Sequence, residues 1–150
     1  MLSRLDALRE EHGLLRSLLG QCDSAPPSEL PPLMARLRVL LRPHLEAKQA
    51  LYVQAVQAVQ ASGTPTELSL LGIFRTNLGV VSGAVMGFLE APDPQPERLR
   101  ERLRTVVGAL RSLLDTEEKV VFPLCVRYSK PAASGAGAGP GRSRFEEGRR

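Results

Sequence analysis

Two histidines are the residues of this chain best suited to chemistry, and both lie in apolar helical patterns. His44 belongs to the stretch HLEAKQALY, within a face whose members are three or four residues apart: Leu37, Leu41, His44, Lys48, Leu51 and Ala55. This spacing predicts one face of a helix, so His44 and Lys48 stand where apolar side chains belong. Burying even a neutral polar group without a partner costs roughly 2–7 kcal/mol, so both side chains need partners.

The other three predicted helices supply candidate partners. Each carries a polar residue in the interior of its apolar face: His12 in the first, Asn77 in the third and Glu118 in the fourth. At about 1.5 Å per residue, the whole set lies in one slab, about 14–25 Å from the end where the first helix starts. Two imidazoles and one carboxylate suit Fe(II) with open coordination positions, or Zn. Lys48 and Asn77 are poor ligands, but a protonated Lys48 can pair with Glu118.

Four amphipathic helices are expected to position this polar layer. Their predicted ranges are 3–19, 28–61, 65–90 and 96–129. The first has an expected cap at Gly20 and an expected core face of Leu5, Leu8, His12, Leu15 and Leu19. The third starts at a strong signal, Thr64-Pro65-Thr66-Glu67, which combines a cap, a first-turn proline and a capping-box glutamate. Pro43 predicts a kink just before His44. With short connections, these helices predict an all-α, up-down-up-down four-helix bundle.

The third predicted helix has an unusual composition. Its expected core face contains Leu70, Ile73, Asn77, Val80, Ala84 and Phe88. Three glycines repeat every four residues beside that face: Gly79, Gly83 and Gly87. Because small residues let helices approach closely, we expect this stripe to pack within the bundle. A membrane-spanning role is not expected, because the other helices are soluble in character.

We expect one domain over residues 1–129 and a disordered tail over 130–150, which is mostly Ala, Gly, Ser, Pro and Arg. The net charge is +4, but charges of both signs alternate along the helices, so we expect no nucleic-acid partner. We count no apolar run of membrane-spanning length and no signal-peptide pattern, which predicts a cytoplasmic protein without a membrane partner. The only cysteines, Cys22 and Cys125, predict no disulfide framework.

Three stretches together resemble the hemerythrin-like (HHE cation-binding) family: EH in the first helix, HLEAKQALY in the second and EEKVVFP late in the fourth. In that family the second helix reads H-x-x-x-E, so His44 matches the histidine and Lys48 falls on the glutamate. The fourth helix has a histidine four or five residues before an acidic ligand. Glu118 matches the acidic ligand, and the histidine position is Leu114 or Leu113.

The resemblance implies two irons bridged by two carboxylates, and a role in oxygen binding, sensing, iron handling or oxidation. The ligands of one iron are kept in this chain, as His12, His44 and the bridging Glu118. The positions of the other iron's ligands hold different residues: Asn77, Leu114 and Lys48. The resemblance therefore implies a degenerate site rather than an ordinary di-iron site.

The first hypothesis is one non-haem iron, or zinc, per chain, held by His12, His44 and Glu118, with Lys48 replacing the charge of the second metal. Open positions on iron would take dioxygen or a substrate, which suggests a sensor or an oxygenase-type enzyme. Tyr52, one turn beyond Lys48, either supports this site and its redox chemistry or keeps its hydroxyl in water.

The second hypothesis is a metal-free helical interaction or regulatory module with an unidentified protein partner. In that case the polar layer is a buried hydrogen-bond network with a Lys48–Glu118 ion pair, which fixes the register of the helices. A third hypothesis is a conventional di-iron site completed by unexpected ligands such as Glu117 or Glu46. The sequence leaves the metal, turnover and oligomeric state open.

Overall fold

The computed structural model describes residues 1–129, which are almost entirely helical and contain no strand. The elements, in chain order, are α1 (Leu2–Ser24), η1 (Pro27–Glu29), α2 (Leu30–Ser62), α3 (Pro65–Glu90), α4 (Pro96–Thr116), η2 (Glu117–Val121) and α5 (Phe122–Ser129). Because α4, η2 and α5 follow one another without a break, they form one long helical segment. The predicted all-α bundle of four helices is therefore correct, and the predicted tail at 130–150 lies outside the described residues.

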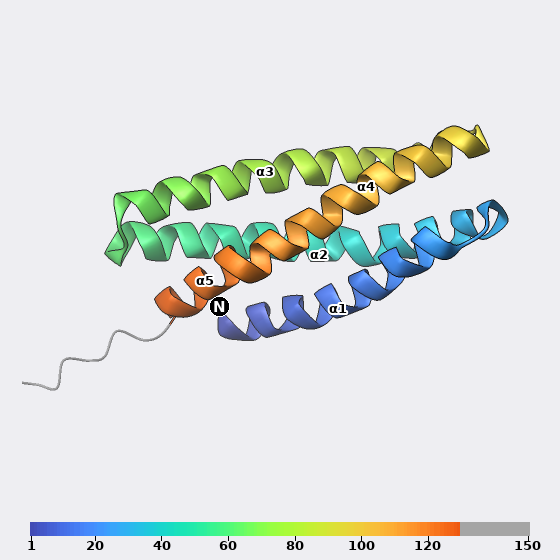
Figure 1. Cartoon of the computed structure of the whole chain (residues 1–150). Coiled ribbons are helices and arrows are strands. Elements are labelled where there is room, and N and C mark those ends of the chain that lie inside the picture. The colour runs from blue at the N-terminus through green and yellow to red at the C-terminus, as the bar shows by residue number, and fades with distance from the viewer. Residues whose placement is uncertain (130–150) are drawn as a thin grey trace, which may run out of the picture.

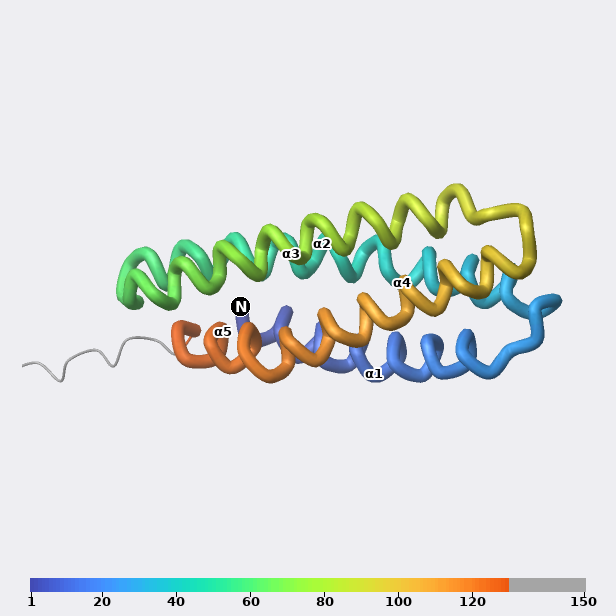
Figure 2. The backbone as a smooth tube through the Cα atoms, turned by 45° about the horizontal axis from the view of Figure 1, so that its top comes forward, coloured from blue at the N-terminus to red at the C-terminus, as the bar shows by residue number. Residues whose placement is uncertain are grey.

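The helical segments lie side by side, with α2 packed against both α1 and α3 (Figure 1). The segment α4–η2–α5 also packs on α1, α2 and α3. Figure 2, seen from another angle, also places α1 and α3 on opposite sides of the bundle. In both views the N-terminus lies near α5. Consequently α3 sits at an edge of the molecule and leaves a long outer face.

The end of α1 and the start of α3 show how residues near a helix terminus determine where the helix stops or begins. α1 was expected to end at Leu19 with Gly20 as its cap, but it continues to Ser24 and stops only before the pair Pro26-Pro27. Gly20 is tolerated inside a helix at a cost of about 1 kcal/mol, whereas the residue before a proline is pushed away from helical geometry. At the start of α3 the predicted capping box is confirmed.

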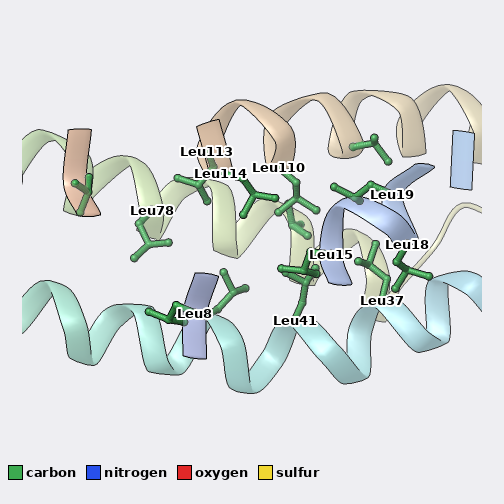
Figure 3. Close-up of a cluster of buried hydrophobic side chains, with 14 of the residues drawn as sticks. Leu8, Leu15, Leu18, Leu19, Leu37, Leu41, Leu78, Leu110, Leu113 and Leu114 are labelled. Carbon is green, nitrogen blue, oxygen red and sulfur yellow. The ribbon is translucent and has the colours of Figure 1, made fainter. Parts of the chain in front are cut away.

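Leucines from all four segments fill the core, and Figure 3 shows ten of them labelled between the helices. The core faces predicted for α1 and α2 are confirmed, because every member is buried: Leu5, Leu8, His12, Leu15 and Leu19 on α1, and Leu37, Leu41, His44, Lys48, Leu51 and Ala55 on α2. Cys22 and Cys125 are buried free thiols, as expected.

The core face predicted for α3 is wrong. The buried residues are Leu71, Leu78, Ser82, Val85 and Leu89, whereas Ile73 and Val80 are 64% and 66% exposed. Apolar residues occur on every side of α3 itself, so the spacing of its apolar residues does not define which side faces the core. Gly79, Gly83 and Gly87 are exposed as well, which contradicts their predicted packing within the bundle.

By length and composition alone, α3 is apolar enough to span a membrane, with a mean hydropathy of 1.4 over its best window, of which 22% is buried. The sequence expectation that the chain has no membrane partner stays a prediction. That expectation required an uninterrupted apolar run, but averaging over a window tolerates residues such as Thr76 and Asn77. The core helix of a bundle passes the same test, so the finding is weak evidence for a membrane.

Proline affects the two long helices differently. α2 continues through Pro43 from Leu30 to Ser62, and the kink predicted there stays a prediction. In the fourth segment the turn before Pro123 is a π-helical turn, in which the Phe122 N–H donates to the carbonyl of Glu117, five residues earlier. A proline ring clashes with the carbonyl four residues before it, and a widened turn relieves that clash.

We predict that Thr64→Ala destabilises the protein by about 1 kcal/mol, because it removes the N-cap of α3. In the folded chain Thr64 Oγ1 accepts from the Glu67 N–H at 3.1 Å, and Glu67 Oε1 accepts from the Thr64 N–H at 3.1 Å. Urea unfolding followed by circular dichroism measures the change. Thr66→Ala is the matched control, because Thr66 lies in the same turn and caps nothing; an equal loss in both variants would contradict the assignment.

Candidate functional site

The centre of the bundle holds a buried ion pair between α2 and the π-helical turn η2. Lys48 Nζ donates to Glu117 Oε1 at 2.5 Å, and both residues are 0% exposed. Burial lowers the pKa of Lys48 and raises the pKa of Glu117, and the contact between the two groups opposes both shifts. Two opposite charges therefore partner each other where neither has access to water.

Glu117, rather than Glu118, is the carboxylate of the core. The sequence placed Glu118 on the core face and in an ion pair with Lys48, but its side chain is 39% exposed. Counting back from Val121 by four residues gives Glu117, and counting on from Leu114 by four gives Glu118, so periodicity alone leaves both open. The tertiary packing of η2 buries Glu117.

Glu118, at the edge of the polar centre, contacts the side chain of His12. The Nδ1 atom of His12 lies 2.9 Å from Glu118 Oε1, and Arg16 donates to the other oxygen of Glu118 at 2.9 Å. The Nε2 atom of His12 lies 3.8 Å from Glu117 Oε1. Burial acts to raise the pKa of Glu118, but its hydrogen bonds to His12 and Arg16 outweigh this and leave the pKa lowered. Glu118 thus orients His12.

His44 is held in the same way by Glu11. The Nδ1 atom of His44 lies 2.5 Å from Glu11 Oε2, and the side chain of Glu11 is 36% exposed. The two imidazole rings lie side by side, with centroids 5.2 Å apart. Both histidines therefore use Nδ1 to bind a carboxylate at the edge of the bundle and keep Nε2 in the interior.

The inner nitrogen atoms of both histidines have no hydrogen-bond partner among the described residues. Burial and the nearby charge of Lys48 lower the pKa of His12 to about 4 and that of His44 to about 3. Both rings are consequently neutral at pH 7. If each Nδ1–H donates to its carboxylate, each Nε2 keeps a free lone pair, which is the tautomer that metal-binding histidines use.

Tyr52 belongs to the same centre. It is 0% exposed, and its hydroxyl donates to Glu117 Oε2 at 3.3 Å. Burial, together with the charge of Glu117, raises the pKa of this phenol. The interpretation that the Tyr52 hydroxyl lies in water is therefore wrong, because the second oxygen of Glu117 takes that place.

Two residues of the predicted layer lie elsewhere. Asn77 is exposed on α3, because the core face of that helix is turned away from it. Leu114 is buried among leucines, next to Leu113, as Figure 3 shows. Counted four residues before Glu117, the histidine position of the resemblance falls on Leu113. The structure therefore brings together His12, His44 and Lys48 of the predicted set, and places Glu118 at their edge.

The donor set fits a metal ion only in part. Among residues 1–129, no group of three or more His, Cys, Asp or Glu side chains is placed to hold a metal. Two buried Nε2 atoms are suitable ligands, but the third candidate, Glu117, is engaged by Lys48. A metal would have to displace the ammonium from this carboxylate.

Sequence reasoning missed two residues of the site. Glu117 was considered only as a substitute ligand, and Glu11 was given no role beyond standing next to His12. The position of Glu11 beside His12 was a signal, because consecutive residues of a helix point in neighbouring directions. Glu11 points toward α2, whereas His12 points into the core. Its partner His44 lies on another helix, and no local pattern specifies that contact.

No protein-family model, no curated protein and no solved structure matches this chain. The resemblance to hemerythrin-like domains therefore stays a prediction from the motifs. The geometry of His12, His44, Lys48 and Glu117 carries the functional argument.

We predict that Lys48→Met and Glu117→Gln each destabilise the protein by about 3–5 kcal/mol, because each leaves a buried group without its partner. The double variant should lose less than the sum, since both charges are removed together. Urea unfolding of the four proteins gives the coupling energy. Lys119→Met is the control, because this exposed lysine should change stability by less than about 0.5 kcal/mol. Additive losses would show that the two residues do not interact.

We also predict that acid destabilises the fold from pH 6.5 downward. Each histidine is neutral in the folded state down to about pH 4, whereas in the unfolded chain it binds a proton below its ordinary pKa of 6.5. Each histidine therefore removes about 1.4 kcal/mol per pH unit in this window. Unfolding free energies between pH 7 and pH 4 measure the slope, from which His44→Gln should remove about 1.4 kcal/mol per pH unit. An unchanged slope in that variant would contradict the burial of a neutral His44.

Proposed function

We propose that this chain is a hemerythrin-like, up-down-up-down bundle that works without a metal, as a helical interaction or regulatory module. The supporting observation is the buried contact between Lys48 Nζ and Glu117 Oε1 at 2.5 Å. In the resemblance, Lys48 stands where the family has a bridging carboxylate. An ammonium in that place changes the local charge by two units and supplies the cation that a carboxylate in the core needs.

The charges of the centre support this proposal. Lys48 and Glu117 cancel each other, and the imidazoles of His12 and His44 are neutral. A metal ion would add at least two positive charges beside the ammonium. Two unit charges about 4 Å apart repel by about 4 kcal/mol at an effective dielectric constant of 20, so each added charge counts against binding.

The network has a use that does not require a metal. It joins α1, α2 and η2 through specific pairs, whereas leucine contacts allow one helix to slide along another. A buried polar set of this kind fixes the register of helices, often without adding stability. A bundle held in one register presents a defined outer surface, which is what an interaction module needs.

A second candidate function is favoured by the two unpartnered Nε2 atoms. Two inward-facing imidazoles, each held at Nδ1 by a carboxylate, form the arrangement that metal sites use to orient their ligands. One iron or zinc ion would then be held by His12 and His44, with Glu117 in place of the predicted Glu118. Iron with open positions would supply dioxygen binding or oxidation chemistry.

We predict that the full chain, purified after expression with added iron and zinc, contains far less than about one metal per chain, and that a chelator leaves its melting temperature unchanged. Elemental analysis and thermal unfolding measure both. About one metal per chain, lost in His44→Ala and kept in a variant of an exposed residue such as Lys119→Ala, would overturn the proposal and establish the second candidate.

Lys48→Glu tests whether the ammonium is what excludes the metal. It places a second carboxylate beside Glu117 and the two free Nε2 atoms, so we expect Fe(II) or Zn(II) to bind and to raise the melting temperature of this variant. Lys119→Glu makes the same charge change on the surface and should gain no metal. Failure of Lys48→Glu to bind either ion while remaining folded would show that Lys48 does not stand at a metal position.

A further inference from the structure

Two adjoining hollows lie between α2 and α3, which run side by side (Figures 1 and 2). The larger one has a volume of about 480 Å³, a size typical of small-molecule sites. Its polar lining residues are Glu46, Gln49 and Arg75, and its apolar ones include Val53 and Leu78. The smaller hollow, of about 350 Å³, shares Glu46 and Gln49 with it. The two hollows therefore form one groove.

The polar side chains of this groove are available to a ligand. Within residues 1–129, Glu46, Gln49 and Arg75 make no hydrogen bond or ion pair with another side chain. Ser82 lines the smaller hollow and is 8% exposed, and its Oγ atom has no hydrogen-bond partner in the same range. Unpaired charges are ordinary on a protein surface, but a buried hydroxyl that bonds to nothing is uncommon. An acid, a base, an amide and a hydroxyl thus converge on one groove.

The two charges of the groove stand at different levels along it. The chain reverses direction between α2 and α3, just after Gly63 (Figure 1). Arg75 follows Gly63 by twelve residues, whereas Glu46 precedes it by seventeen. The difference of five residues separates their levels by about 7–8 Å at 1.5 Å per residue. Both charges therefore line one hollow without pairing, and a molecule that carries two opposite charges can contact both.

We propose that this groove binds a small zwitterion, namely an unbranched amino acid whose ammonium and carboxylate are separated by several methylene groups. The ammonium donates to the carboxylate of Glu46 and to the Ser82 hydroxyl, which both accept hydrogen bonds. The carboxylate of the ligand accepts from the guanidinium of Arg75, whose fork of N–H groups matches two oxygen atoms. The methylene chain lies against Val53 and Leu78.

The charges of the groove separate this ligand from simpler ones. A ligand with only a negative charge would leave Glu46 without a partner, and one with only a positive charge would leave Arg75 without one. Arg42 and Glu90 also line the smaller hollow, but they pair with each other and offer no free charge. The inference goes beyond the proposed function, because the groove lies outside the polar centre and does not depend on what occupies it.

Gly79 keeps the groove open. It lines both hollows, and a Cβ atom added to it would meet no atom within 4 Å. Gly13 and Gly108 also face open space, but neither lines these hollows. A large side chain at position 79 would therefore occupy the volume that the ligand needs.

Isothermal titration calorimetry of the full chain with free glycine, γ-aminobutyrate and ε-aminocaproate tests the proposal. We expect a dissociation constant below about 1 mM for at least one of the two longer compounds. Free glycine should bind at least about tenfold more weakly, because its two charged groups are too close together to reach both Glu46 and Arg75. Butylamine and butyrate, which carry one charge each, should also bind at least about tenfold more weakly than the better zwitterion.

Glu46→Gln and Arg75→Gln should each weaken binding of the better zwitterion at least about tenfold. Glu10→Gln and Arg104→Gln are the matched controls, because these exposed residues lie outside the groove and should leave the affinity unchanged. Gly79→Leu fills the hollow and should abolish binding, whereas Gly13→Leu should not. Circular dichroism confirms that each variant folds.

Three results would overturn the proposal. The first is no binding of any of the zwitterions at about 10 mM. The second is equal binding of the singly charged compounds, or equal weakening by the groove variants and their controls. The third is binding of the chain to phosphatidylethanolamine vesicles, whose headgroup carries an ammonium and a phosphate, in place of the free compounds.

Discussion

The ion pair between Lys48 and Glu117 is the interaction on which the centre of this bundle depends. Both charges are fully buried, and removing either one would leave the other buried without an opposite charge. Glu117 is shared, because its second oxygen accepts from Tyr52. The pair therefore fixes where η2 lies against α2, and this position decides which glutamate enters the core.

Around that pair, the polar side chains become more exposed to solvent with distance from the centre of the bundle. Burial and, after it, the positive charge of Lys48 lower the pKa of His12 and His44 and keep both imidazoles neutral. Their outer nitrogen atoms reach half-exposed carboxylates, Glu118 and Glu11, which remain in contact with solvent. Charge is thus fully paired inside and progressively solvated outside, and the buried side-chain atoms left unpartnered among the described residues are the inner nitrogen atoms of the histidines and Ser82 Oγ on α3.

The third helix stands apart from this arrangement. α1, α2 and η2 supply every member of the polar centre, whereas α3 contributes buried apolar residues and Ser82. A helix with no part in the polar centre must satisfy only packing, which allows an apolar composition on all sides. That freedom explains both the ambiguous periodicity of α3 and the exposed apolar face at the edge of the molecule.

Local physics in the sequence determined much of this protein: four helices, the capping box at Thr64 and the core faces of α1 and α2, because each follows from spacing or capping between near neighbours. It also determined that His44 and Lys48 are buried and need partners. Only the tertiary structure decided who those partners are. Glu117 and Glu118 differ by one position on a helix, and the choice between them follows from the packing of η2 against α2, which no local pattern contains.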